Sequence, residues 1–396
     1  MRKFLLYVAG AGLIWFIFWS QSDSLEDKGE RRFRALSEPA MEVLVGVSWP
    51  SQVNQDGMLD GLQLALDEIN SGHLAGEHSI RLVIRDDGFD RTKARQIAME
   101  FANTPEISAV IGYYDDDIAA KAAAIFEPSR LLNIIIGANK TAMTAHGYEY
   151  LVRTVLSSAK IARRLAEFSE NRGYRKYAII REHEAFGNDL AHHYGVALDD
   201  FNLRVGPDSS IDVVYQWSYS RARADFRLPV NQLKGVDADV IFLAGLEPMA
   251  GDFLRGARRV GLTTPILGAF SDTPELRERA GAAVEGAMIY VEYDVNSPSP
   301  ENQAFVRKFR SRYGRDPSIW AAQGYDALHI LAKAIKLTGS RNPLDLSYAI
   351  RYMDAWEGAN GRYKFTGEGE LEDKPIFMKQ YQNGEPVAVD MPPGRL

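Results

Sequence analysis

Few residue patterns in this chain could support catalysis. The sequence has no phosphate-binding glycine loop, no Gly-x-Ser-x-Gly elbow and no His-Glu-x-x-His pair. It has no cysteine, which excludes disulfides, thiolate metal ligands and a cysteine nucleophile. His183, His192 and His193 lie close together, but no cysteine or carboxylate completes a metal-ligand pattern, so a solvated helix face is favoured. We expect no catalytic residue, no metal site, no cofactor and no enzyme activity.

Aromatic and acidic residues follow short apolar runs. Trp49 comes just after the run 42–47, and three aspartates at 115–117 come just after the run 107–112. An aromatic ring in such a place can form one wall of a small-molecule site. The aspartates have an alternative interpretation, because acidic residues at the start of a helix cap its free N–H groups and favour its dipole.

The apolar runs alternate with amphipathic helical patterns along most of the chain. The predicted strands are 42–47, 79–85, 107–112, 132–137, 176–181, 211–217, 239–245 and 264–268. The predicted helices between them are 57–70, 91–103, 118–127, 160–172, 188–201, 222–234 and 249–260, followed by 301–313, 319–337 and one opening at 342. Near the end, 362–365 and 376–382 are predicted to pair as a hairpin.

This alternation predicts an α/β fold with two doubly wound lobes, each with a mainly parallel sheet. Continuous apolar strands between amphipathic helices are typical of parallel sheets covered on both faces. The two series are of similar length, and no sequence repeat relates them. Ligands of open parallel sheets bind outside the carboxyl ends of the strands. We therefore expect a site in the cleft where the two lobes face each other.

The first residues predict export. Arg2 and Lys3 precede an uncharged, mostly apolar run, 4–19, which matches a secretory signal. The alternative is an uncleaved membrane anchor, although sixteen helical residues at ~1.5 Å each reach about 24 Å of the ~30 Å hydrocarbon layer. Either way the rest of the chain lies outside the cytoplasmic membrane, because the two basic residues stay inside. Residues 1–22 are thus a signal peptide or anchor, and polar residues 23–40 a flexible tether.

Net charge excludes one class of partner. The chain carries a formal charge of −7, and phosphate backbones require clustered Lys and Arg. We expect no nucleic-acid partner.

Eight stretches in order resemble the type I periplasmic binding proteins, and among them the leucine/isoleucine/valine-binding branch. They are DDGFD (86–90), AVIGYYDDD (109–117), IIGANKTAMTAHGYEYLVRT (135–154), AFGNDLA (185–191), ARRVGLTTPILG (257–268), AAVEGAMIYVEY (282–293), FVRKFRSRYGRDPS (305–318) and GYDALHILAKAIKLTGS (324–340). The resemblance implies lobes built from interrupted chain, joined by three crossovers near 153–157, 290–295 and 338–343, which close around a ligand by hinge motion. The expected first lobe is 41–154 plus 294–338, and the second is 155–293 plus 339–396.

The resemblance also implies binding residues. The serine that the family places after its third strand falls on Asp116, and the threonine after the fourth falls on Asn139. The tyrosine of the family's Tyr-Gly segment becomes Phe186. The acidic residue that usually holds the ligand ammonium falls on Phe270, with Asp272 two places on, and an expected aromatic falls near Leu246 and Glu247. With Trp49 added, the predicted ligand-binding residues are Trp49, Asp116, Asn139, Phe186, Glu247, Phe270 and Asp272.

These departures share a direction. Groups that would bind a ligand carboxylate are lost, while carboxylates and aromatic rings are gained, which suits a neutral or cationic ligand with an apolar or aromatic body. Phe186 and Phe270 could instead be core residues. The predicted function is a periplasmic solute-binding protein that captures an amino-acid-like or related ligand for an ABC permease in the inner membrane. The alternative is a membrane-tethered sensing ectodomain that assists a signalling partner.

Overall fold

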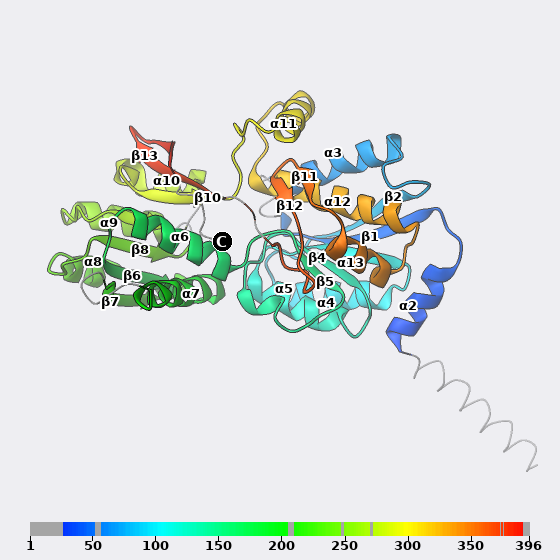
Figure 1. The fold of residues 1–396 in the computed structure, drawn as a ribbon, viewed down its shortest axis with the longest axis horizontal. Helices are drawn as coiled ribbons and strands as arrows, with labels where there is room; N and C mark the ends of the chain where they lie inside the picture. The colour runs from blue at the N-terminus through cyan, green and yellow to red at the C-terminus, as the bar shows by residue number, and fades with distance from the viewer. Residues whose placement is uncertain are drawn as a thin grey trace, which may run out of the picture.

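The computed structural model describes residues 27–51, 57–204, 210–246, 249–269, 272–372, 374 and 376–390. Two α/β lobes lie side by side (Figure 1), each with its own sheet. The predicted fold class is confirmed, since every strand pair within 42–291 is parallel.

The first lobe holds a five-stranded parallel sheet in the order β2-β1-β3-β4-β5. Its strands are β1 (Glu42–Ser48), β2 (Ser79–Arg85), β3 (Ile107–Gly112), β4 (Leu132–Ile135) and β5 (Leu151–Arg153). Its helices are α3 (Met58–Ser71), α4 (Arg91–Asn103), α5 (Asp116–Phe126), α12 (Ile319–Thr338) and α13 (Pro343–Tyr352). Apolar residues of α3 and α12 form the core on one face, and those of α4 and α5 form the core on the other. The central strand β3 is buried along its whole length, which explains its unbroken apolar sequence.

The second lobe holds a seven-stranded sheet in the order β14-β13-β10-β9-β8-β6-β7. Its strands are β6 (Lys176–Glu182), β7 (Asp212–Tyr219), β8 (Val240–Ala244), β9 (Ile266–Gly268), β10 (Met288–Val291), β13 (Phe377–Gln382) and β14 (Glu385–Val389). Helices α6 (Ser158–Asn171) and α7 (Ala185–Asn202) cover one face, and α8 (Arg227–Leu233), α9 (Met249–Arg259) and α10 (Pro274–Ala280) cover the other. Helix α11 (Pro300–Tyr313) follows the second sheet and leads to α12.

The predicted C-terminal hairpin is wrong. Residues 361–363 form β12, which pairs with β11 (Trp356–Gly358) in the first lobe. Strand β13 pairs with β14 and β10 in the second lobe. Both segments have strand-like sequences, and their true partners differ because the chain crosses between lobes after Leu371, where the last first-lobe bridge, Phe365 to Leu371, ends.

The expected lobe boundary at 338–343 is corrected in the same way. Helix α13 packs against α12, β4 and β5, so it belongs to the first lobe. The third crossover therefore lies between Leu371 and β13, while the first lies between β5 and α6 and the second between β10 and α11.

The predicted tether is also partly wrong, because residues Lys28–Ser37 form a docked helix, α2. Its Arg32 is 1% exposed, and its guanidinium donates to backbone carbonyls of Ile107 at 3.1 Å and of Phe101 and Thr104 at 3.0 Å each. The last two carbonyls lie at the carboxyl end of α4, where free acceptors and the helix dipole favour a cation. Helix α2 is thus fixed to the first lobe, at the end remote from the second (Figure 1).

Candidate functional site

The carboxyl ends of the two sheets meet through contacts between the lobes. Thr141, which follows β4 in the first lobe, donates from its backbone N–H and its hydroxyl to Asp189 on α7, at 2.8 and 3.0 Å. The segment after β4 therefore contacts α7, and so does α5, which follows β3. The residues after β1, β3 and β4 lie at one edge of the first sheet, because its strands are parallel. We call these residues, with the start of α12, the interlobe edge of the first lobe.

An aromatic cluster occupies this edge. The Trp49 ring lies 5.5 Å from the rings of both Tyr114 and Trp320, and the last two rings are 4.9 Å apart. Phe89 contacts Tyr114 edge to face at 5.2 Å and is itself 38% exposed. Trp49 is 1% exposed and forms the floor, whereas Tyr114 and Trp320 are half-buried. The cluster provides an apolar, polarisable wall of the kind that small-molecule sites use.

Asp116 follows Tyr114 by two residues, lies in the first turn of α5 and is 6% exposed. One carboxylate oxygen accepts the backbone N–H of Lys140 at 2.9 Å, and the Asn139 N–H also bonds the carboxylate. The other oxygen, Oδ2, is buried without a hydrogen-bond partner among the described residues. Burial raises the pKa of Asp116 to about 6, against the opposing effect of the two backbone N–H groups. A buried acceptor with one unused oxygen is suited to a ligand that donates a hydrogen bond.

The neighbouring aspartates have structural roles. Asp115 is the N-cap of α5 and accepts the N–H groups of Asp117 and Ile118, each at 3.0 Å. Asp117 forms a 2.7 Å ion pair with Arg91. The helix-capping interpretation of this acidic run is therefore right for Asp115.

Asn139 and Phe186 also lie where the lobes meet. The Asn139 side-chain amide donates to the Leu156 carbonyl at 2.6 Å, and the Asn139 backbone carbonyl accepts the N–H of Ser158 at 2.8 Å. Asn139 thus holds the first crossover in place. Phe186, the second residue of α7, is half-buried and packs against the main core, so it serves at least partly as a core residue.

The remaining predicted site residues fall in the second lobe. Glu247 and Phe270 lie outside the described residues. Asp272 is half-buried, and both its oxygens accept from Arg277 at 2.8 Å while Tyr381 donates to it at 2.6 Å. Burial alone would raise the pKa of Asp272, but these three donors outweigh it and lower the pKa. Both oxygens of Asp272 therefore already accept hydrogen bonds from residues of the second lobe.

Sequence reasoning missed a charged pair on the second lobe. Glu182, the last residue of β6, is fully buried and pairs with Arg221, which follows β7. Burial lowers the pKa of Arg221, but Glu182, Glu184 and the first-lobe Asp115 raise it more, and the net shift is upward. The charge of Asp115 in the first lobe therefore acts on Arg221 in the second. Its position shortly after a strand was the signal that could have identified it.

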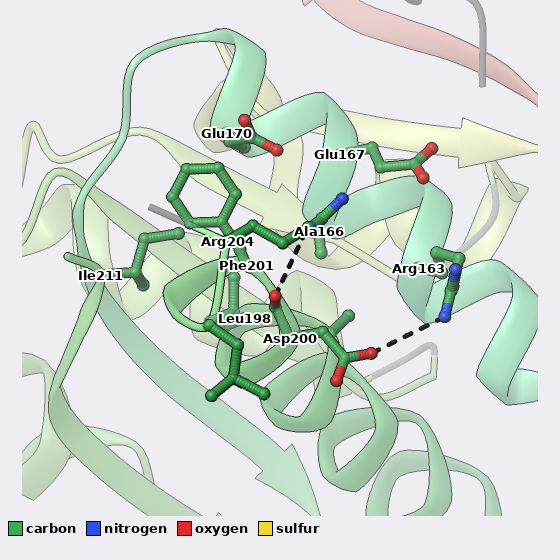
Figure 2. A pocket seen from close by; sticks show the side chains of 11 residues that line it. Arg163, Ala166, Glu167, Glu170, Leu198, Asp200, Phe201, Arg204 and Ile211 are labelled. Atoms are coloured by element: carbon green, nitrogen blue, oxygen red, sulfur yellow. Dashed lines mark hydrogen bonds and ion pairs between the residues drawn. The ribbon is translucent and has the colours of Figure 1, made fainter. Parts of the chain in front are cut away.

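Two surface grooves lie elsewhere. One, of about 330 Å³, runs between α6 and α7 over Leu198 and Phe201, and is crossed by an Arg163–Asp200 ion pair of 3.7 Å (Figure 2). The other, of about 440 Å³, lies beside β7 and α7. Neither contains a residue of the aromatic cluster or Asp116, so the interlobe edge remains the candidate site.

The described residues also lack two other features. Within these residues no group of three or more His, Asp or Glu side chains is arranged to hold a metal ion. The same part of the chain contains no helix with the length and apolar character needed to cross a bilayer.

Comparison with known proteins supports one family. A family described as periplasmic binding protein matches residues 43–385. The chain is 25% identical over 350 residues to the Leu/Ile/Val-binding protein homolog 1 of Brucella suis, covering 87% of this chain and 91% of that protein. It is 27% identical over 347 residues to the leucine-specific-binding protein of Salmonella typhimurium, covering 85% of this chain and 89% of that protein.

Solved structures agree. An ABC transporter substrate-binding protein from Desulfitobacterium hafniense superposes with a TM-score of 0.78 at 28% identity, over 88% of this chain and 100% of its own. A structure described as that organism's substrate-binding protein in complex with Leu gives 0.77 at 27% identity, with the same coverage.

Proposed function

Because the chain belongs to the family of periplasmic binding proteins, we propose that it captures a small amino-acid-like or related solute between its lobes and delivers it to an ABC permease. The lobes supply facing edges, and hinge motion is the general way in which such proteins enclose a ligand. The relatives from Brucella and Salmonella are named for branched-chain amino acids, which supports a ligand of similar size.

One observation carries the location of the site. The segment after β3 carries Tyr114 of the aromatic cluster and, two residues on, the buried Asp116, whose Oδ2 lacks a partner among the described residues. A buried acceptor normally has a partner, because leaving it unsatisfied costs about 1–3 kcal/mol. A ligand that donates to Asp116 while its apolar body contacts the rings would supply that partner.

The same acceptor supports a ligand without a carboxylate at this point. Two carboxylates about 4 Å apart repel by ~4 kcal/mol at an effective dielectric of 20, nearly a thousandfold in affinity. Asp116 could escape this cost by protonation, since burial brings its pKa to about 6. The preferred ligand is therefore a neutral or cationic donor with an apolar or aromatic body, rather than a zwitterion oriented with its carboxylate toward α5.

Across the lobes, Arg221 supplies the only guanidinium that we assign to the site. It remains 46% exposed in its pair with Glu182. If a ligand does carry a carboxylate, Arg221 is the group that would receive it, with the ligand's donor end toward Asp116.

Native mass spectrometry of the exported chain tests this proposal. A co-purified small molecule of amino-acid size, released when the protein is unfolded, is the expected result. The Asp116→Asn variant should retain less of it than Asp117→Asn, a matched control whose carboxylate pairs with Arg91. A copurifying nucleotide or peptide, or equal retention by both variants, would contradict the proposal.

Location and transport role are tested in cells. Release by osmotic shock of protein starting near Asp23 would support a cleaved signal, and retention in salt-washed membranes would support an anchor in residues 4–19. Loss of solute uptake on deletion of the gene is expected for the importer role. Unchanged uptake with a lost transcriptional response would support the sensing ectodomain.

A further inference from the structure

A buried charge network joins the three crossovers between the lobes. Glu292 follows β10 directly and is 8% exposed, and Lys374, in the third crossover, is 1% exposed. The first crossover contributes Leu156, whose backbone N–H donates to the Glu292 carboxylate. One short segment of each crossover thus meets at a single point.

The network is fixed to the first lobe by α12. Asp326 on α12 is fully buried and accepts the backbone N–H groups of Ala359 and Asn360, each at 2.7 Å, and the Tyr363 hydroxyl at 2.9 Å. Lys374 donates to the same Tyr363 hydroxyl at 3.0 Å, and its ammonium lies 4.3 Å from the ring centre.

Amide side chains complete the connection. Asn360, with its amide oriented to satisfy its neighbours, donates to the Glu292 carbonyl at 2.7 Å and accepts from Lys374 and Gln323, each at 3.0 Å. Gln323 on α12 also accepts the hydroxyl of Thr154, in the first crossover, at 3.2 Å. Every crossover is therefore tied to α12 or to the β11–β12 hairpin.

Few residues remain between these ties and the second lobe. Only Ser157 separates Leu156 from α6, Glu292 follows the last residue of β10, and two residues separate Lys374 from β13. Lys160 of α6 reaches the third crossover from the other side, donating to the Glu372 carbonyl at 2.8 Å.

We propose that Glu292 and Lys374, with the residues bonded to them, form a hinge network that holds all three crossovers against the first lobe. The second lobe then rotates about the few residues just beyond this network. Hinge motion is commonly absorbed by a few residues at the ends of elements, and this network determines which residues are left to absorb it. Asn360 joins the second and third crossovers, because it bonds both the Glu292 carbonyl and Lys374. The opposite charges of Glu292 and Lys374 add an attraction between the same two crossovers, and the Leu156 bond adds the first.

The charges that face Glu292 make this hinge network respond to pH. Lys374 and Arg153 attract its carboxylate, and Arg153 is itself paired with Glu370. Lys374 in turn faces Asp326. Burial raises the pKa of Glu292 and lowers that of Lys374, because each charged form is desolvated. Burial brings the pKa of Glu292 to about 7, so as pH falls through that value Glu292 is neutralised while Lys374 stays charged, and the attraction between the crossovers is lost.

Distances between the lobes test the proposal without any ligand. Because the chain has no cysteine, Gln96→Cys on α4 and Asn231→Cys on α8 give two unique spin-label sites, both exposed. Pulsed dipolar spectroscopy of the full-length protein would compare pH 8 with pH 5. We expect a narrow distance distribution at pH 8 that broadens at pH 5.

Two variants separate the network from general electrostatics. Glu292→Gln keeps the shape and removes the charge, so it should give the broad distribution at both pH values. Asp294→Asn, two residues further on and paired with Lys379 at 3.3 Å, should behave like the parent protein. Lys374→Met removes the other charge and should also give the broad distribution at both pH values. If that variant does not fold, the double variant Glu292→Gln/Lys374→Met removes both charges and should give the same result.

A distribution that is the same at both pH values in the parent and unchanged by Glu292→Gln would overturn the proposal. So would a pH response that survives Glu292→Gln, because another group would then be titrating.

Discussion

Two carboxylates, one from each lobe, show how differently the two regions use an acid. Asp116 in the first lobe keeps one buried oxygen without a partner among the described residues, and burial raises its pKa to about 6. Asp272 in the second lobe is bonded by Arg277 and Tyr381, which lower its pKa despite burial. Asp116, which we propose binds the ligand, therefore has fewer hydrogen-bond donors than Asp272, which stabilises its own lobe.

The surroundings of the two acids follow the same division. Asp116 lies two residues after Tyr114 of the aromatic cluster, and its hydrogen-bond donors are the backbone N–H groups of Lys140 and Asn139. In the second lobe, Glu182 and Asp272 each pair with an arginine. The first lobe therefore supplies an apolar wall with an acceptor, and the second supplies charge that is already balanced.

The largest expected loss of stability comes from removing the cation of the Glu182–Arg221 pair in the second lobe. Arg221→Met leaves the fully buried Glu182 without its cation, which should cost about 3 kcal/mol of unfolding free energy, the lower end for a buried pair, because Arg221 is 46% exposed and water screens its charge. Denaturant unfolding at pH 7 measures this. Arg227→Met is the control, because its partner Asp225 and Arg227 itself are exposed. An equal loss in both variants would contradict a balanced buried pair.

The next effect separates Asp116 from Asp272 by the sign of its pH dependence. The folded state of the parent protein binds the Asp116 proton more tightly than the unfolded state. Its unfolding free energy should therefore fall by about 3 kcal/mol, relative to Asp116→Asn, as pH rises from about 4 to above 6. Unfolding curves at pH 4 and pH 7 measure the difference. A constant gap between the two proteins would show that Asp116 ionises freely.

A smaller effect of opposite sign is expected at Asp272. Its lowered pKa means that its contribution is present at neutral pH and lost as the carboxylate is protonated on acidification. Arg277→Met should cost about 1–2 kcal/mol at pH 7 and less near pH 3. Unfolding curves at the two pH values measure it. A cost that grows on acidification would mean that the pair does not hold Asp272 ionised.

Much of the fold could be predicted because apolar runs and helical periods are local signals. The runs that became β1, β3 and β8 are unbroken because these central strands are largely or wholly buried. The C-terminal strands could not be paired from sequence, since β12 and β13 are both half-buried and join different lobes. The helix within 23–40 could not be predicted from the local sequence. Arg32 fixes it to carbonyl groups that lie about 70 residues or more away along the chain.

The site was only partly predictable for the same reason. Trp49 directly follows β1, and Asp116 comes four residues after the end of β3, so a position near the carboxyl ends of these strands could be expected for both. Trp320 begins α12, far along the chain, and its contact with Trp49 depends on how that helix packs on the first sheet. Tyr381, which donates a hydrogen bond to Asp272, lies 109 residues further along the chain.

Calorimetric titration of one ligand pair tests the central claim most directly. The account predicts that L-leucinamide, a cation with an apolar body, binds the parent protein more tightly than L-leucine. Asp116→Asn should weaken leucinamide binding by at least about tenfold, or ~1.4 kcal/mol, while Asp117→Asn should leave it unchanged. Micromolar leucine binding that is equal in the parent protein, Asp116→Asn and Asp117→Asn would contradict it, because the ligand would then not contact Asp116.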